Sequence, residues 1–252
     1  MSIAVSLMVG LTPTKVERSS DIFNDYFYPN EKILFHFDDD VTLVLTHEQS
    51  FMSWLKDELS KESYKELIRI SNSTRTFIGS SVVLKYLNKK GLNSVKDLDL
   101  LVENINDAKP KIKVSWEYGS HDFFGGSDNL GLSYTSPKFT CPFDLWSLRD
   151  TAFLKDTTVP VDDLIVDVLN HSPLNCNCIL YDIKNDTFIT DERGYLSTYL
   201  NGTLEIVNVN ASINNYIPRK ANKLKVENLS LQFGTSLTNY LKELQEKEII
   251  NA

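Results

Sequence analysis

The sequence predicts a mixed α+β protein with a small helical region at its C-terminal end. Apolar runs of strand length alternate with segments of helical periodicity up to about residue 210, and only helical patterns follow. The 252 residues are 42% hydrophobic and 24% charged, which is typical of a globular domain long enough to bury a sizeable core. We expect a body over residues 1–210 and a helical region over residues 211–252.

The first quarter of the chain predicts a strand, a hairpin and two helices. Residues 1–11 are apolar, lack a basic start and are too short to span a bilayer, so they indicate a buried strand better than a signal peptide. Two β-rich runs around an Asp-Asp-Asp turn predict a hairpin over 31–46. Helical spacing predicts helices over 47–60 and 61–72.

A strand–helix–strand unit follows. A short strand over Thr76–Ile78 ends at Gly79, where a helix begins, and Gly91 ends the helical pattern. The next strand covers residues 96–102. The elements predicted beyond this unit are, in order, a strand at 111–118, a glycine-rich loop at 119–137, a strand at 138–148, a helix at 159–170, a hairpin at 178–190, a helix at 191–202, a strand at 203–209, and helices at 219–229 and 236–250.

Charge and cysteine content restrict the class of protein. The net charge of −8 argues against a broad nucleic-acid surface, although a local basic groove remains compatible with it. The cysteines Cys141, Cys176 and Cys178 are odd in number and have neither the spacing of a zinc site nor that of a disulfide framework. Free thiols in a reducing cytoplasm are the expectation, and no segment is long and apolar enough to predict a membrane span.

The turn at Gly79 and Ser80 has the features of a phosphate cradle. The N-terminus of a helix offers unpaired backbone N–H groups and the positive end of the helix dipole. Glycine permits close approach of a phosphate, and Ser80 adds a hydroxyl. The alternative is an ordinary helix cap, because Gly-Ser pairs are common at helix starts.

Three aspartates indicate a metal site. Asp97 and Asp99 alternate with leucines on a strand, so both carboxylates point to one side, where they repel each other unless a cation lies between them. Mg²⁺ or Mn²⁺ would bind such a pair, because hard cations take oxygen ligands. A solvent-facing pair on an edge strand is the alternative. Asp144, flanked by Phe143 and Leu145, is the candidate third carboxylate of a two-metal site. Its competitors for that role are Glu117, Asp122 and Asp128.

The pattern IGSSVV…KDLDLLV…PFDLWSL resembles the nucleotidyltransferase superfamily of DNA polymerase β, and in layout it is nearest to the head domain of poly(A) polymerases and CCA-adding enzymes. The resemblance extends over about residues 75–245. It implies a nucleotidyltransferase-like mixed sheet, and transfer of a nucleoside monophosphate from an NTP such as ATP with release of pyrophosphate. In this scheme Asp97 and Asp99 hold two metal ions, Asp144 holds the catalytic one, and the turn at Gly79 and Ser80 holds phosphates.

The resemblance also suggests further nucleotide contacts. Asn175 matches the asparagine of the family's layout, and the basic residues Arg219, Lys220 and Lys223 lie where a helical neck would contact triphosphate or acceptor phosphates. A solvated helix face is the alternative for the basic residues. The family's Arg-Arg-Asp run and its base-reading Glu-Asp-x-x-Arg motif are not evident, so the sequence leaves the choice of nucleotide open.

The acceptor is the least determined part of the hypothesis. The layout and the basic neck favour an RNA 3′ end of tRNA type. A protein hydroxyl, as in nucleotidyltransferases of the toxin–antitoxin type, and a small molecule are the other acceptors. The alternative outside enzymes is a degenerate nucleotide-binding regulatory module, which the absent Arg-Arg-Asp run would favour and the three carboxylates oppose.

Overall fold

The computed structural model describes residues 13–18, 32–36, 41–46, 49–88, 90–92, 95–118, 131–151, 158–190, 202–208, 217–219, 221–222 and 232–250. The strands of its main sheet are β1 (Pro13–Arg18), β2 (Lys32–His36), β3 (Val41–Thr46), β4 (Thr76–Ile78), β5 (Leu98–Val102), β6 (Trp116–Tyr118), β7 (Gly131–Tyr134), β8 (Phe143–Ser147), β9 (Ile179–Asp182) and β10 (Thr187–Thr190). The main helices are α2 (Phe51–Glu58), α3 (Lys61–Ser73), α4 (Ser80–Leu87), α5 (Ile105–Ala108), α6 (Leu148–Thr151), α7 (Val161–Asn170) and α9 (Thr235–Ile250). The fold is therefore mixed α+β, as the sequence predicts.

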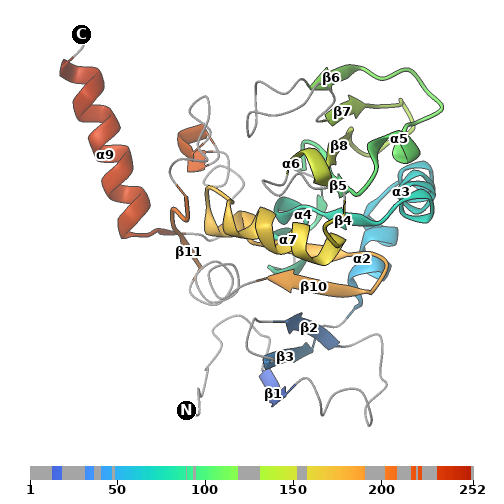
Figure 1. Ribbon diagram of the computed structural model, residues 1–252, viewed down its shortest axis with the longest axis horizontal. Helices are drawn as coiled ribbons and strands as arrows, with labels where there is room; N and C mark the ends of the chain where they lie inside the picture. The colour runs from blue at the N-terminus through green and yellow to red at the C-terminus, as the bar shows by residue number, and fades with distance from the viewer. Residues whose placement is uncertain are drawn as a thin grey trace.

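The ten strands form one sheet in the order β1-β3-β2-β10-β9-β4-β5-β8-β7-β6 (Figure 1). Most neighbours are antiparallel, and two pairs, β2 with β10 and β5 with β8, are parallel. The predicted hairpin over 31–46 is confirmed, because β2 pairs with β3 in antiparallel register. Strand β1 lies beyond the apolar residues 1–11, which fall outside the described residues, and its pairing with β3 was not predicted.

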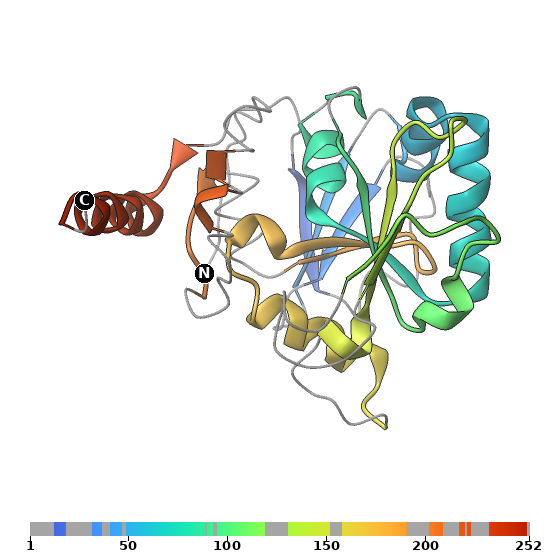
Figure 2. The same cartoon turned by 90° about the horizontal axis from the view of Figure 1, so that it is seen from above.

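Helices cover both faces of the sheet (Figure 2). Successive residues of β5 point to opposite faces of the sheet. Leu98, Leu100 and Val102 are fully buried, while the two residues between them are partly exposed. The three buried residues belong to the larger core, to which α2, α3 and α4 contribute. On the opposite face, Phe77 and Leu101 pack with α6 and α7 in a second core.

Two sequence predictions in the middle of the chain are wrong. The strand predicted at 111–118 is confined to β6, three residues long, and its lysine-rich first half is irregular. The stretch 119–137, predicted to be a loop throughout, contains β7. This strand forms because its backbone pairs with both β6 and β8, the strands before and after it in the chain, and its own composition does not reveal these pairings.

The C-terminal region is tied to the body by a small second sheet. Strand β11 (Thr203–Leu204) pairs in parallel with β12 (Gln232–Phe233), which lies between the two predicted C-terminal helices and was not predicted. Helix α9 confirms the second of these helices. Only residues 217–219 and 221–222 of the first helical region are described, and they are helical, whereas the predicted helix at 191–202 falls almost wholly outside the described residues. The boundary near residue 210 remains a prediction.

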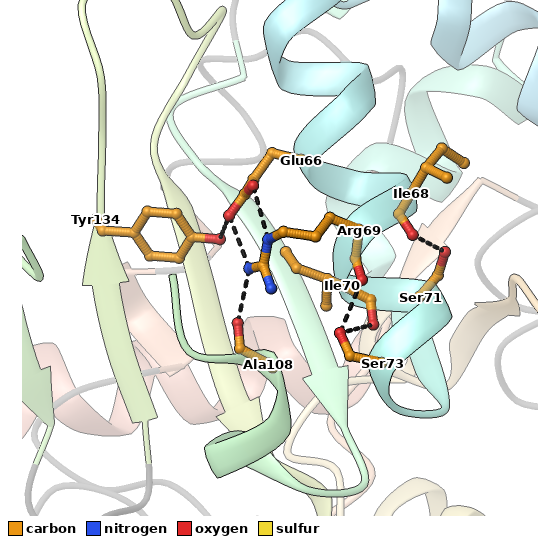
Figure 3. A network of polar contacts seen from close by, with 8 residues as sticks. All are labelled: Glu66, Ile68, Arg69, Ile70, Ser71, Ser73, Ala108 and Tyr134. Carbon is orange, nitrogen blue, oxygen red and sulfur yellow. Dashed lines mark hydrogen bonds and ion pairs between the residues drawn. The ribbon is translucent and has the colours of Figure 1, made fainter. Parts of the chain in front are cut away.

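A partly buried ionic network fastens α3 to the sheet (Figure 3). Glu66 accepts hydrogen bonds from Arg69, at 2.8 and 2.9 Å, and from the hydroxyl of Tyr134 on β7, at 2.8 Å. Arg69 also donates to the carbonyl of Ala108 at the end of α5. Burial acts to raise the pKa of Glu66, but the bonds from Arg69 and Tyr134 outweigh it, so the pKa lies below its ordinary value.

Within the described residues, no helix combines the length and the apolar character needed to cross a membrane.

We expect Tyr134→Phe to lower the free energy of unfolding by about 1.5–3 kcal/mol, because it removes a hydrogen bond to a charged group. The lowered pKa of Glu66 means that its stabilising effect is present above its unfolded pKa and is lost as the pH falls through its folded pKa. The difference between Tyr134→Phe and the unmutated protein should therefore shrink on acidification below about pH 4.5. Urea unfolding at pH 7 and at pH 3.5 checks both statements, and a difference that stays constant with pH would contradict the assignment to the ionised Glu66.

Candidate active site

The parallel pairing of β5 with β8 places two of the predicted aspartates side by side. Asp99 is the direct partner of Asp144 in this register. Directly paired residues on neighbouring strands point to the same face, and neighbouring strands lie about 4.8 Å apart. Asp99 is partly exposed, whereas Asp144 is 7% exposed. The structure thus brings two carboxylates from segments 45 positions apart in the sequence to adjacent places on one face.

Asp97 lies on the same side, just before β5. The amide of Leu98 donates to the carbonyl of Pro142 at 2.8 Å, so the pairing of the two strands extends to the N-terminal end of β5. Asp97 precedes Asp99 by two residues, and strand periodicity points both to one face. All three carboxylates therefore come from the same end of the same two strands.

Cys141 lies among these aspartates and was not predicted to be part of the site. Burial raises the pKa of its thiol to about 11, and the negative charges of Asp97, Asp144 and Asp99 act in the same direction. The thiol of Cys141, which is 6% exposed, therefore lies close enough to all three carboxylates for their charges to raise its pKa. Its position three residues before Asp144 was the available signal in the sequence.

Gly79 is in direct contact with Asp99. The amide of Gly79 donates to the carbonyl of Asp99 at 2.8 Å, and a Cβ on Gly79 would lie 3.0 Å from the Cβ of Asp99. The backbone of Gly79 is extended, with φ −73° and ψ 164°, a conformation that any residue can adopt. Glycine is therefore required here by the close contact with Asp99. Helix α4 begins at the next residue, Ser80, so the open N–H groups of its first turn lie beside the carboxylate strand.

The one competing candidate for the third carboxylate that the structure describes, Glu117, does not join this group. Glu117 pairs with Leu132, which pairs with Leu145, and Leu145 pairs with Leu100. This row is offset by one residue from the row of Asp99 and Asp144, so Glu117 points to the opposite face. Asp122 and Asp128 fall outside the described residues.

The predicted nucleotide contacts beyond α4 comprise one buried amide, one exposed side chain and two residues that are not described. Asn175 is fully buried, and its side-chain amide donates to the carbonyl of Thr203 at 2.8 Å and accepts from the amide of Glu205 at 3.0 Å. These bonds join the 3₁₀ turn Asn175–Asn177 to the segment of β11. Arg219 is exposed on a helical turn, whereas Lys220 and Lys223 are outside the described residues. A nucleotide-binding role for these four residues remains a prediction.

The donor set suits a hard divalent cation, because carboxylate oxygens are the ligands that Mg²⁺ prefers. Over the ranges that the structure describes, no group of three or more His, Cys, Asp or Glu side chains is arranged closely enough to hold a metal ion. Metal binding by Asp97, Asp99 and Asp144 therefore also remains a prediction.

Comparison with known proteins supports the fold. No family model matches the sequence, and no curated protein matches it. Among solved structures, the apo form I of a CCA-adding enzyme superposes with a TM-score of 0.54 and 13% identity over 81% of this chain and 47% of that one. A Thermotoga maritima CCA-adding enzyme complexed with tRNA gives 0.52 and 14% over 79% and 46%. A CCA-adding enzyme with CTP gives 0.51 and 14% over 79% and 45%.

The chain spans less than half the length of these enzymes. At such low identity the likeness concerns the fold, and it agrees with the fold that the sequence motifs imply. The chain has a nucleotidyltransferase-like fold.

Proposed function

We propose that the protein transfers a nucleoside monophosphate from an NTP to the 3′ hydroxyl of an RNA and releases pyrophosphate. The observation that carries the proposal is the row formed by Gly79, Asp99 and Asp144, in which the N-terminus of α4 lies beside two paired carboxylates. A phosphate-binding helix end next to metal-binding oxygens is the arrangement that phosphoryl transfer requires. The CCA-adding enzymes of similar fold, solved with CTP, ATP and tRNA, support the NTP and the RNA as substrates.

In this proposal Asp97 and Asp99 would hold two Mg²⁺ ions, and Asp144 would help to hold the catalytic one. Bound metal would supply the positive charge that stabilises the transition state. The N–H groups at the start of α4 bind the β- and γ-phosphates. The acceptor oxygen attacks the α-phosphorus, the bond from that phosphorus to the bridging oxygen breaks, and pyrophosphate leaves. The hydroxyl proton passes to Asp144 or to water.

Labelling experiments distinguish the possible acceptors. We expect label from an α-³²P NTP to enter total RNA at 3′ ends when the protein and Mg²⁺ are present. Label found only in cell protein would contradict the RNA acceptor and leave nucleotidyl transfer standing. No transfer, together with no thermal shift on adding NTP and Mg²⁺, would contradict the enzyme, whereas a thermal shift without transfer would favour a nucleotide-binding regulatory module.

We expect Asp99→Asn to reduce nucleotidyl transfer at least about 100-fold, because it removes a metal ligand and its charge. The thermal midpoint should not fall, since the substitution relieves repulsion with Asp144. Asp163→Asn, an exposed aspartate in the first turn of α7, is the matched control and should keep its activity. Full activity in Asp99→Asn would refute the proposed site.

We expect Gly79→Ala to reduce activity strongly and to destabilise the protein by about 1–3 kcal/mol, because the new Cβ pushes against the backbone and Cβ of Asp99. The matched control is Gly91→Ala, whose Cβ would meet only the carboxylate of Glu58, at 3.1 Å, and this carboxylate also accepts from the amide of Leu92. Urea unfolding and transfer assays on both variants test this expectation. Equal behaviour of the two variants would show that the contact between Gly79 and Asp99 does not matter.

A further inference from the structure

Trp116 is an unusually exposed aromatic residue. It lies in β6, the last strand at one edge of the ten-stranded sheet, and it is 65% exposed. Large aromatic side chains are generally well buried, because leaving their apolar surface in water is unfavourable. An indole in this position therefore calls for an explanation.

The strand register places Trp116 in the row of the carboxylates. Trp116 pairs with Ser133 of β7, Ser133 pairs with Asp144, and Asp144 pairs with Asp99. Directly paired residues share a face, so the indole stands on the same face of the sheet as both carboxylates. Two strand spacings separate it from Asp144, or about 10 Å between Cα atoms. In Figure 1 the strands β5, β8, β7 and β6 follow one another toward this edge.

The order of the residues along the row from Asp99 to Trp116 indicates which substrate would lie near Trp116. Gly79 and the N-terminus of α4 lie next to Asp99, at the opposite end of the row from β6. If the triphosphate binds there, as the proposed function requires, pyrophosphate leaves on the β4 side. Attack on phosphorus is in line, so the acceptor hydroxyl must come from the other side, where β7 and β6 lie.

The charge at this edge suits a polynucleotide. The segment that leads into β6 carries three exposed lysines within five residues, Lys109, Lys111 and Lys113, in a chain whose net charge is −8. The adjacent amide of Ser115 donates to the carbonyl of Ser133, which holds the end of this segment to the sheet. Clustered lysines attract phosphates, and an exposed aromatic ring offers a surface on which a base stacks.

We propose that Trp116 is a stacking platform for one of the last bases of a single-stranded RNA acceptor, and that Lys111 and Lys113, in the segment leading into β6, bind the phosphates of that RNA. The proposal rests on the proposed function for the direction from which the acceptor enters. It assigns a binding role to an edge strand that carries none of the catalytic carboxylates.

The test measures binding separately from catalysis. The full chain is titrated into a fluorescently labelled RNA oligonucleotide with a free 3′ end, without NTP, and anisotropy gives Kd. We expect Trp116→Ala to weaken binding roughly 5- to 150-fold, and Trp116→Phe to recover most of the affinity because a ring is restored. Glu117→Ala, on the same strand but on the opposite face, is the matched control and should bind like the unmutated protein. The thermal shift produced by NTP should be the same in all four proteins.

Three outcomes would overturn the stacking platform. They are unchanged RNA affinity in Trp116→Ala, equal losses in Trp116→Phe and Trp116→Ala, and no RNA binding by the unmutated protein while it labels a protein acceptor. RNA binding that depends on the ring at position 116, without any nucleotidyl transfer, would support the platform and contradict the proposed function. The two proposals can therefore fail independently.

The lysines are tested through salt dependence. We expect the double variant Lys111→Gln, Lys113→Gln to bind RNA more weakly at low salt and to lower the slope of log Kd against log salt concentration by about one to two. Trp116→Ala should leave that slope unchanged, since stacking releases no counterions. Titrations between 50 and 200 mM salt measure the slope, and an unchanged slope in the double variant would remove the lysines from the proposed surface.

Discussion

The parallel pairing of β5 with β8 sets two like charges side by side, and the rest of the candidate site is arranged around that pair. On the other face of the same two strands, Leu98, Leu100, Phe143 and Leu145 are all fully buried. Each contributes roughly 1.5–3 kcal/mol on burial, whereas two carboxylates about 5 Å apart repel by roughly 3 kcal/mol at an effective dielectric constant of 20. Apolar burial therefore outweighs the repulsion and holds the carboxylates together.

Local sequence patterns were sufficient where neighbouring elements are also neighbours in the chain. The hairpin of β2 and β3, the hairpin of β9 and β10, and the β4–α4–β5 unit follow from turn residues and periodicity. The pairing of β11 with β12 depends on partners distant in the sequence. Strand β7 pairs with the next strand in the chain, but its Gly-Leu-Ser-Tyr sequence gives a weak strand signal. Propensity carries little information about such partners, because strand formation depends on what lies alongside.

The same distinction applies to the candidate site. The alternation of Asp97 and Asp99 with leucines, and the isolated Asp144, are local patterns from which the three candidate carboxylates can be predicted. That Asp144 lies opposite Asp99, and that Trp116 continues the row, are consequences of register across four strands, which no single segment encodes. Asn175 illustrates the opposite case, since its buried amide bonds to the backbone of Thr203 and Glu205. A residue predicted from a family motif, such as Asn175, can therefore also stabilise the fold around a site.

The contact between Gly79 and Asp99 has a consequence for how such a chain can diverge. The separation between the helix N-terminus and the carboxylate strand is set by a backbone hydrogen bond and by the lack of a side chain at one position. Neither depends on the identity of the surrounding residues, apart from their being apolar enough to bury. Sequence drift can therefore replace most of the core while the dimensions of the site persist. A CCA-adding enzyme has a similar fold at only 13% identity.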